Sequence, residues 1–469
     1  MSEFEDHFKE RSDEINCALL AIISGENLLY LGPPGTAKSL LSKNICEVVD
    51  GYFFYYLLTR FTTPEEIFGP LSLKALQHDD FRRKVDGYLP TAHIAFLDEI
   101  FKSNSSILNS LLTILNEKRF HNGRDVIKIP LLSVFGASNE LPDEDENLEA
   151  LYDRFLFRCS VSCVRDENNF KELIFGDADS FKPSFKIPLE KIDEIKRVSG
   201  KVKIDRDVEK IILETRKEFL RKNIHLSDRR WKKIVNVLKI ASASMGNEVV
   251  DRSMVLLLQH MTWDTPSQKE HIRNILIDQI ISGGESLEKL KKDVTDLYFL
   301  VQRTMDYKFP LPIRCYQCNE IFDTSKKLGV HRKIFSNHMY YDPHRISLNL
   351  RYFNYPDLVK VLKEEYKWNF IDNTPERSRS YATELVDLKE RFEHARKKVE
   401  EEFELLKKLF AENIWITEND RIEVLNRYEH KINPLQEIKE TFRMIESMLE
   451  QNEQISIVEK MSSLEATAQ

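Results

Sequence analysis

The feature that most constrains the fold of this chain is a glycine-rich loop between an apolar run and a helical pattern. Residues 27–31 are apolar and predict a buried strand, and residues 39–49 have helical spacing. A loop in this setting is typical of a P-loop, whose backbone N–H groups and helix N-terminus bind phosphates. The predicted phosphate-binding residues are Gly32, Pro33, Pro34, Gly35, Thr36, Ala37, Lys38 and Ser39.

Two side chains at the end of this loop suit a nucleotide. Lys38 would reach the β- and γ-phosphates of ATP, and the Ser39 hydroxyl would bind Mg²⁺. The strict pattern has glycine where Ala37 stands, and a methyl group is tolerable there if the residue has helical dihedrals. The alternative is an ordinary Gly-Pro turn that caps a helix.

Two further apolar runs end in polar side chains. Residues 93–97 precede Asp98 and Glu99, and residues 131–137 precede Asn139. Asp98 would help to hold Mg²⁺, and Glu99 would orient and polarise the attacking water. An amide at Asn139 could bind the γ-phosphate and that water. The alternatives are an acid pair acting as a helix N-cap and a turn asparagine.

The order of strands and helices predicts an α/β fold. Helical patterns separate the three apolar runs, which favours a parallel sheet covered on both faces. Residues 200–285 show helical spacing throughout, as do residues 286–304 and 382–449, with a break near 413–420. We therefore expect a nucleotide-binding domain (1–178), an all-α lid (179–284), a helical stalk (285–305 and 380–455), an inserted module (306–379) and a flexible tail (456–469).

Composition narrows the class of protein. The chain has 469 residues, of which 42% are hydrophobic, and its net charge is −8. A mildly acidic chain is not a general polyanion binder. Six cysteines in this length do not form a disulfide framework, and the apolar runs are too short to cross a membrane. We expect a cytoplasmic protein without a membrane span.

The inserted module contains a pattern typical of zinc sites. Two cysteines spaced Cys-x-x-Cys are followed by two histidines, and a phenylalanine and a leucine occupy the core positions of a small ββα finger. Reduced, metal-free cysteines in an ordinary core are the alternative. The predicted ligands of structural Zn²⁺ are Cys315, Cys318, His331 and His338, with His344 less favoured for the last position; Phe322 and Leu328 are the core residues. Cys159 and Cys163 are expected on a core strand.

The module also carries local positive charge. Residues 313–345 contain six Lys or Arg and three Asp or Glu, which gives +3. Val330 occupies a base-reading position and suits it poorly, so sequence-specific DNA reading is disfavoured. Docking of a protein is the leading interpretation, and backbone binding to nucleic acid is the alternative. The residues suited to phosphates are Lys326, Lys327, Arg332 and Lys333.

The three motifs in this order resemble those of AAA+ ATPases. The strings at residues 59–72, 136–142, 150–158 and 226–233 resemble the MoxR family, specifically its RavA subgroup (regulatory ATPase variant). The resemblance is strong over residues 5–265, weaker near 407–424 and absent over 306–378. In RavA-like proteins a helical stalk carries an inserted partner-binding domain, and the finger-like module occupies the equivalent place here.

The resemblance implies roles for further residues. Asn139 corresponds to sensor 1. Arg154 corresponds to the arginine finger, which reaches the nucleotide of a neighbouring subunit, and Arg158 is the second candidate. Arg229 corresponds to sensor 2 in the lid, with Arg230 as its alternative. For each arginine, a surface salt bridge is the competing interpretation.

The resemblance also implies an assembly and a function. Family members are hexamers, and residues 61–93 and 116–130 correspond to a helix-2 insert and a pre-sensor-1 hairpin, which face the pore side of the ring. We expect an ATPase that remodels or regulates a protein partner, with a von Willebrand factor A domain protein as the first candidate. The alternatives are a nucleic-acid-associated ATPase recruited through its finger, for example in bacterial antiviral defence, and a scaffold whose assembly ATP controls.

Overall fold

The computed structural model describes residues 2–142, 146–175, 183–282, 287–304 and 375–466, with short stretches at 313–314, 321–322, 330–331 and 334. These residues divide into two compact units. Unit 1 comprises residues 1–284 and 402–428, and unit 2 comprises residues 285–401 and 429–469. The chain enters unit 2 near the predicted boundary at 284. Residues 402–428 lie in unit 1, although we expected them in the stalk.

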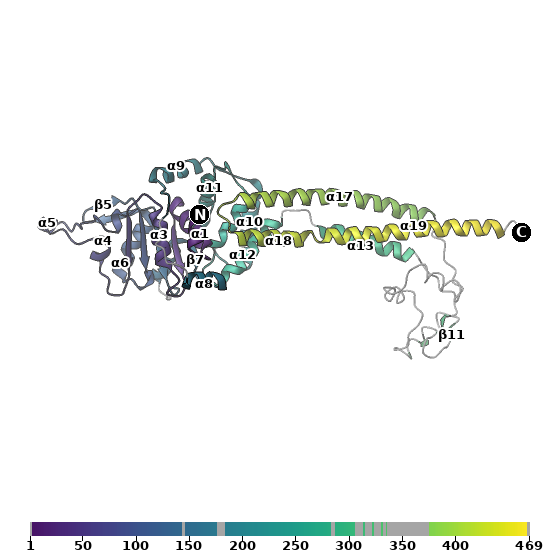
Figure 1. The fold of residues 1–469 in the computed structure, drawn as a ribbon, viewed down its shortest axis with the longest axis horizontal. Coiled ribbons are helices and arrows are strands. Elements are labelled where there is room, and N and C mark those ends of the chain that lie inside the picture. The colour runs from purple at the N-terminus through teal and green to yellow at the C-terminus, as the bar shows by residue number, and fades with distance from the viewer. Residues whose placement is uncertain are drawn as a thin grey trace. The chain divides into compact units, whose positions relative to one another are not determined.

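Unit 1 is built on a five-stranded parallel sheet (Figure 1). Its strand order is β2-β3-β6-β1-β7. Every residue of β1 and β6 is buried, so helices cover both faces of the sheet centre, as predicted. The strands are β1 (Asn27–Leu31), β2 (Phe53–Leu57), β3 (Ile94–Asp98), β6 (Ser133–Ser138) and β7 (Phe155–Ser160).

Strand β2 was not predicted from the sequence. It pairs only with β3 and lies at the edge of the sheet, where Tyr55 and Leu57 are half exposed. An edge strand of this kind lacks the continuous burial that marks the central strands. The prediction for Cys159 is confirmed, because this residue is buried on β7. The prediction for Cys163 is wrong: it lies beyond the end of β7 and is exposed.

Helices flank the sheet and continue into the lid. Helices α2 and α3 contact each other and the strands. The lid is helical as predicted, apart from a two-residue parallel pair between β8 (Lys203–Ile204) and β9 (Val249–Val250). The helices of unit 1 up to residue 282 are α1 (Ser2–His7), α2 (Ser12–Ser24), α3 (Lys38–Glu47), α4 (Pro64–Phe68), α5 (Leu73–Leu76), η1 (Leu89–Thr91), η2 (Ile100–Lys102), α6 (Ser105–Glu117), α7 (Glu146–Asp153), α8 (Glu167–Phe175), α9 (Leu189–Ser199), α10 (Arg206–Arg221), α11 (Asp228–Ser244), η3 (Arg252–His260) and α12 (Gln268–Ile281).

The two predicted insertions pack against each other. Strands β4 (Arg119–Asn122) and β5 (Asp125–Lys128) form an antiparallel hairpin, and Gly123 in its turn has φ 64°. The Asn122 side chain accepts a hydrogen bond from the Arg83 backbone N–H at 2.6 Å. The Phe68 and Phe120 rings stack with centroids 5.4 Å apart. The insert around α4 and α5 and the hairpin therefore form one substructure.

A turn between two C-terminal helices anchors residues 402–428 in unit 1. Helix α17 (Pro375–Glu412) ends before this turn and α18 (Glu418–Ile432) follows it. Asn413 donates to the Ser253 hydroxyl at 2.7 Å, and the Trp415 indole donates to the Ser244 hydroxyl at 3.0 Å. Arg252 binds Glu402 at 2.6 Å. These contacts lie in the predicted break at 413–420 and beside it.

Unit 2 contains a bundle of long helices. Helix α13 (Leu287–Thr304) packs against α19 (Pro434–Ala466), and the Phe392 ring of α17 meets Phe442 of α19 with centroids 5.5 Å apart (Figure 1). Helix α19 continues to Ala466, within the segment for which a flexible tail was predicted. The predicted apolar face of α17 is buried along its whole length: Leu388, Phe392, Ala395, Val399, Phe403, Leu406 and Phe410 are each at most 8% exposed.

Among the described residues, no helix is both long and apolar enough to span a membrane.

Candidate active site

Three predicted motifs meet at the carboxyl edge of the sheet. Strand β6 lies between β1 and β3, and all three are parallel. The loop after β1 carries residues 32–39, the end of β3 carries Asp98 and Glu99, and Asn139 follows β6. The carboxyl edge of such a sheet is where ligands of open α/β folds bind.

The backbone of the loop after β1 fits a phosphate cradle. A Cβ atom at Gly32 would lie 2.0 Å from the Val161 carbonyl oxygen, so only glycine fits there. Gly35 has φ 79° and open space around its Cα. Ala37 has φ 62° and ψ 20°, which is left-handed. Our condition for tolerating its methyl group, right-handed helical dihedrals, is therefore not met, and the residue is strained.

Lys38 is held by the loop that it ends. Its Nζ donates to the Gly32 carbonyl at 2.7 Å, to the Pro33 carbonyl at 2.9 Å and to Asn139 Oδ1 at 3.1 Å. Burial lowers the pKa of this ammonium, and the nearby carboxylates Asp98 and Glu99 oppose that shift. Its three acceptors hold the ammonium over the phosphate cradle.

Ser39 and Asp98 offer oxygen ligands side by side. The Ser39 hydroxyl donates to Asp98 Oδ2 at 2.9 Å, and Asp98 Oδ1 accepts from the Glu99 backbone N–H at 3.0 Å. Hydroxyl and carboxylate oxygens are the ligands that Mg²⁺ prefers, usually with substrate phosphates and water completing the shell. These residues fit the ion that the P-loop pattern implies.

Glu99 is fixed by its backbone and by two neighbours. It has φ 51° and ψ 46°, a left-handed conformation that is rare for glutamate and clusters at functional sites. Its Oε1 accepts from Asn139 Nδ2 at 2.6 Å, and Lys102 Nζ lies 3.2 Å from Oε2. Asn139 thereby connects Lys38 to Glu99.

Lys102 was not predicted to belong to the site. It follows Glu99 by three residues, and helix η2 returns its side chain to the acid. It also lines a cavity of about 300 Å³ beside the site. The three-residue spacing between Glu99 and Lys102 is visible in the sequence, but it indicates a contact only once helix η2 is known. The lining residues are Arg60, Phe101, Lys102, Ser103, Asn104, Ser138, Glu140, Leu141 and Leu148.

Arg154 and Arg229 lie at the opposite edge of the sheet. Asn27 begins β1 and donates to the Arg154 carbonyl oxygen at 3.0 Å, and the residue after Arg154 pairs with Asn27. Strand β1 has five residues, so about 16 Å separates its two ends. Arg154 is therefore far from the phosphate loop of its own chain.

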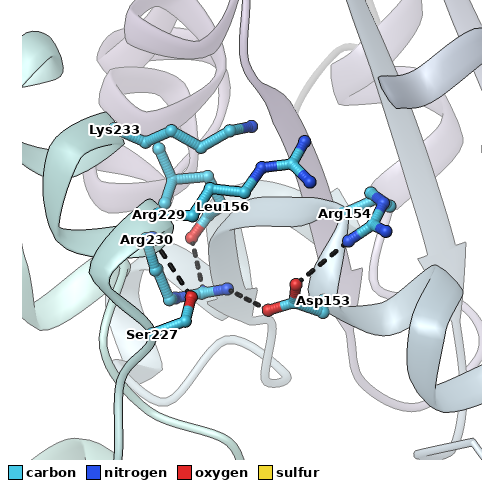
Figure 2. A pocket seen from close by; sticks show the side chains of 7 residues that line it. All are labelled: Asp153, Arg154, Leu156, Ser227, Arg229, Arg230 and Lys233. Atoms are coloured by element: carbon cyan, nitrogen blue, oxygen red, sulfur yellow. Dashed lines mark hydrogen bonds and ion pairs between the residues drawn. The ribbon is translucent and has the colours of Figure 1, made fainter. Parts of the chain in front are cut away.

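The start of α11 lies at this same amino edge. Arg229 donates to Asn116 at the end of α6, and Lys233 binds Glu26, the residue before β1, at 2.6 Å. Arg154 is paired with Asp153 at 3.1 Å. Figure 2 shows the small pocket that these side chains share; it is lined by Asp153, Arg154, Leu156, Ser227, Arg229, Arg230 and Lys233.

The alternative arginines are both buried and have several partners. Arg158 binds the Trp263 carbonyl and Asp264, and its guanidinium lies 3.9 Å from the Tyr152 ring centroid. Arg230 donates to the carbonyls of Met261 and Leu156. Both connect the sheet domain to the lid, and neither is exposed. The geometry therefore favours Arg154 and Arg229 for contacts outside the chain.

The predicted zinc ligands lie almost entirely outside the described residues. Cys315, Cys318 and His338 are among those outside, as is His344. His331 is described and is buried. Strands β10 (Ile313–Arg314) and β11 (Ile321–Phe322) pair antiparallel on either side of the Cys-x-x-Cys segment in sequence. The zinc site stays a prediction.

Comparison with known proteins places these motifs in a family. The model of the MoxR domain in MoxR-vWA-beta-propeller ternary systems matches residues 1–198, and an AAA lid domain model matches residues 207–276. An uncharacterised protein of Methanocaldococcus jannaschii is 39% identical over 326 residues, which cover 67% of this chain and 84% of that protein. The chain contains a MoxR-family AAA+ ATPase domain.

Two further relatives delimit the similarity. A second uncharacterised protein of Methanocaldococcus jannaschii is 44% identical over 267 residues, 57% of this chain and 71% of the relative. Chaperone MoxR1 of Mycobacterium tuberculosis is 26% identical over 161 residues, 34% of this chain and 41% of the relative. The MoxR domain model matches residues 1–198, which include the whole carboxyl-edge site, and the AAA lid domain model continues to residue 276.

Proposed function

We propose that this chain is an Mg²⁺-dependent ATPase whose ring, a hexamer as the family resemblance implies, remodels or regulates a protein partner. The ATPase proposal is carried by one observation: Lys38, Asn139 and Glu99 are grouped at the carboxyl edge of the sheet. Lys38 contacts Asn139, and Asn139 contacts Glu99. A phosphate-binding cation, a sensor amide and a base thus form one hydrogen-bonded group.

Each of these side chains has a part in hydrolysis. On binding ATP, Lys38 would exchange its loop carbonyls for the β- and γ-phosphates. Ser39 and Asp98 would hold Mg²⁺, which neutralises the negative charge that develops on the phosphates. Glu99 would orient the attacking water and accept its proton, while Asn139 would hold the γ-phosphate in line.

We also propose that Arg154 and Arg229 act on the nucleotide of a neighbouring subunit. Their place at the amino edge, about 16 Å from the carboxyl edge, supports this role. A head-to-tail ring joins two different surfaces of neighbouring subunits, so the amino edge of one subunit can meet the carboxyl edge of the next. A cationic side chain there stabilises the charge of the departing phosphoryl group.

The helix-2 insert and the hairpin are the proposed contacts for a protein partner. Phe61 is 92% exposed, and Leu73 and Phe81 are also largely exposed. Exposed apolar side chains on one substructure favour a protein-binding surface. A von Willebrand factor A domain protein is the first candidate, and the matched family model carries that domain in its description. The RavA-like subgroup stays a prediction.

The nucleic-acid alternative depends on Lys326, Lys327, Arg332 and Lys333, which lie outside the described residues. No described observation favours it over a protein partner. Salt-sensitive binding that disappears when these four charges are removed would revive it. The scaffold alternative predicts that ATP controls the assembly state of the ring and that no partner is remodelled.

Two substitutions test the ATPase proposal directly. Lys38→Ala is expected to abolish ATP binding, because it removes the ammonium from the phosphate cradle. Glu99→Gln keeps the shape of the side chain and is expected to retain ATP binding but lower kcat by at least about 100-fold. Fluorescent-nucleotide titration and phosphate release measure the two effects. A Glu99→Gln protein that hydrolyses ATP at the wild-type rate would overturn the assignment of the base.

A further inference from the structure

Glu99 is held at both of its carboxylate oxygens. Oε1 accepts a hydrogen bond from Asn139, and Oε2 lies 3.2 Å from the Lys102 ammonium. Oε2 is buried and has no hydrogen-bond partner among the described residues, so the lysine is near it without being aligned as a donor. The contact with Lys102 is therefore an ion pair that a small movement can break.

The backbone conformation at Glu99 brings the two charged side chains of this ion pair together. The left-handed conformation of Glu99 starts helix η2, whose last residue is Lys102. The Lys102 backbone N–H bonds the Glu99 carbonyl at 2.9 Å, which places the two side chains one turn apart. A base that is to take a proton from water needs an oxygen directed at that water. Both oxygens of Glu99 are instead directed at neighbouring side chains.

A second acid, Glu140, lies on the wall of the cavity that Lys102 lines. Lys102 and Glu140 line the same cavity of about 300 Å³. The Lys102 side chain is 46% exposed and that of Glu99 is 17% exposed, so the lysine can turn away while the acid stays in the site. Glu140 follows Asn139 directly, so it lies next to the residue that contacts both Lys38 and Glu99. The cavity supplies both the room and the alternative partner for the ammonium.

We propose that Lys102 is a positioning residue that holds Glu99 in a resting orientation and releases it for turnover by moving to Glu140. The proposal rests on the ATPase function described above. Binding of ATP draws Lys38 away from Asn139, which frees that amide to move with the γ-phosphate. Transfer of the Lys102 ammonium to Glu140 then leaves Glu99 Oε2 open to water.

Steady-state hydrolysis at saturating ATP and Mg²⁺ tests this exchange. Lys102→Met removes the ion pair and is expected to raise kcat by about two- to fivefold, without changing the KM for ATP. Lys102→Arg keeps the charge and should stay near the wild-type rate. Glu140→Gln removes the alternative partner and should lower kcat by a similar factor. In the double variant, the loss of Glu140 should have no further effect.

The outcomes separate this proposal from the ATPase proposal. A Lys102→Met protein with kcat at or below the wild-type value overturns the holding role. A Glu140→Gln effect that persists without Lys102 overturns the exchange. If Lys102→Met folds poorly, Lys102→Gln makes the same test. In either case the ATPase proposal is judged independently, by wild-type turnover and its loss in Glu99→Gln.

Discussion

Ala37 carries a methyl group on a left-handed backbone at the start of α3. This conformation costs an L-residue about 1–2 kcal/mol, and glycine would avoid that cost. Glycine also raises the conformational entropy of the unfolded chain, which offsets part of the gain. Ala37→Gly is therefore expected to raise the free energy of unfolding by about 0.5–1 kcal/mol. Thermal unfolding without nucleotide measures it. An Ala37→Gly protein less stable than the wild type would show that the loop adopts another conformation.

Glu14 makes stability depend on pH. Burial, together with the nearby Asp13 carboxylate, raises the pKa of Glu14 from 4.5 to about 7. Between these two values the unfolded chain releases a proton that the folded chain keeps, so the free energy of unfolding falls as pH rises. Because the pKa of Glu14 rises by about 2.5, the free energy of unfolding is lower by about 3 kcal/mol above pH 7 than below pH 4.5.

Replacing this acid with an amide removes that pH dependence. Glu14→Gln is expected to raise the unfolding temperature at pH 8 and to leave it nearly unchanged near pH 4.5. The exposed Glu5→Gln on α1 is the matched control and should change neither. Thermal melts at the two pH values measure the effect. Equal gains at both pH values would contradict this account of Glu14.

The family resemblance ranked Arg154 above Arg158 and Arg229 above Arg230, but no pattern in the sequence gives a physical reason for that order. Arg154 and Arg158 lie four residues apart, and Arg229 and Arg230 are adjacent. Their difference is burial, which depends on distant contacts such as those of Arg158 with Trp263 and Asp264. The P-loop and acid-pair motifs were predictable because each stands directly at a strand end. Lys102 was not, because its contact needs the left-handed turn at Glu99.

At the scale of elements, Arg273 of α12 binds two acids of α18. Arg273 binds Asp420 and Glu423, each at 2.6 Å, and Asp420 is 5% exposed. Arg273→Ala leaves the buried Asp420 charge without its cation, so we expect a loss of about 3 kcal/mol in the free energy of unfolding. The urea midpoint measures this, and proteolysis near 413–417 should increase.

A matched control distinguishes this pair from surface charges. Lys217→Ala removes an exposed ion pair with Glu214 on α10, and its urea midpoint should equal that of the wild type. If Arg273→Ala behaves like Lys217→Ala, then Asp420 is stabilised by other groups, such as the Gln259 amide at 2.9 Å.

The zinc prediction also belongs to this scale. Four N and S ligands at the predicted spacing bind one Zn²⁺ in a tetrahedral site. Purified protein is expected to contain about one zinc per chain by elemental analysis, and Cys315→Ser with Cys318→Ser should remove it. Metal-free wild-type protein, prepared without chelators in zinc-containing medium, would contradict the prediction.

Elements with one dominant pattern were predictable, and elements with mixed exposure were not. Strand β1 and the apolar face of α17 follow from continuous or helical apolar spacing. Strand β2 was missed because an edge strand in this sheet exposes alternate side chains. The anchoring of residues 402–428 in unit 1 includes contacts between residues far apart in sequence, such as that between Asn413 and Ser253, which no periodicity signals.

At the scale of the whole molecule, we propose an ATPase site divided between two subunits. The carboxyl edge of one chain would supply Lys38, Asp98, Glu99 and Asn139, and the amino edge of the next would supply Arg154 and Arg229. Neither edge would be complete alone. Arg154→Ala is therefore expected to retain ATP binding and lose turnover by about 10³-fold, like other arginine fingers.

Mixing two inactive variants tests this division most directly. Glu99→Gln subunits lack the base but keep Arg154, and Arg154→Ala subunits have the reverse defect. In randomly mixed rings about one quarter of the interfaces combine the intact base with the intact arginine, so ATP hydrolysis should return to about a quarter of the wild-type rate. Glu99→Gln mixed with the double variant forms no intact interface and should stay inactive. If the first mixture also stays inactive in rings shown to exchange subunits, the site is not shared between neighbours.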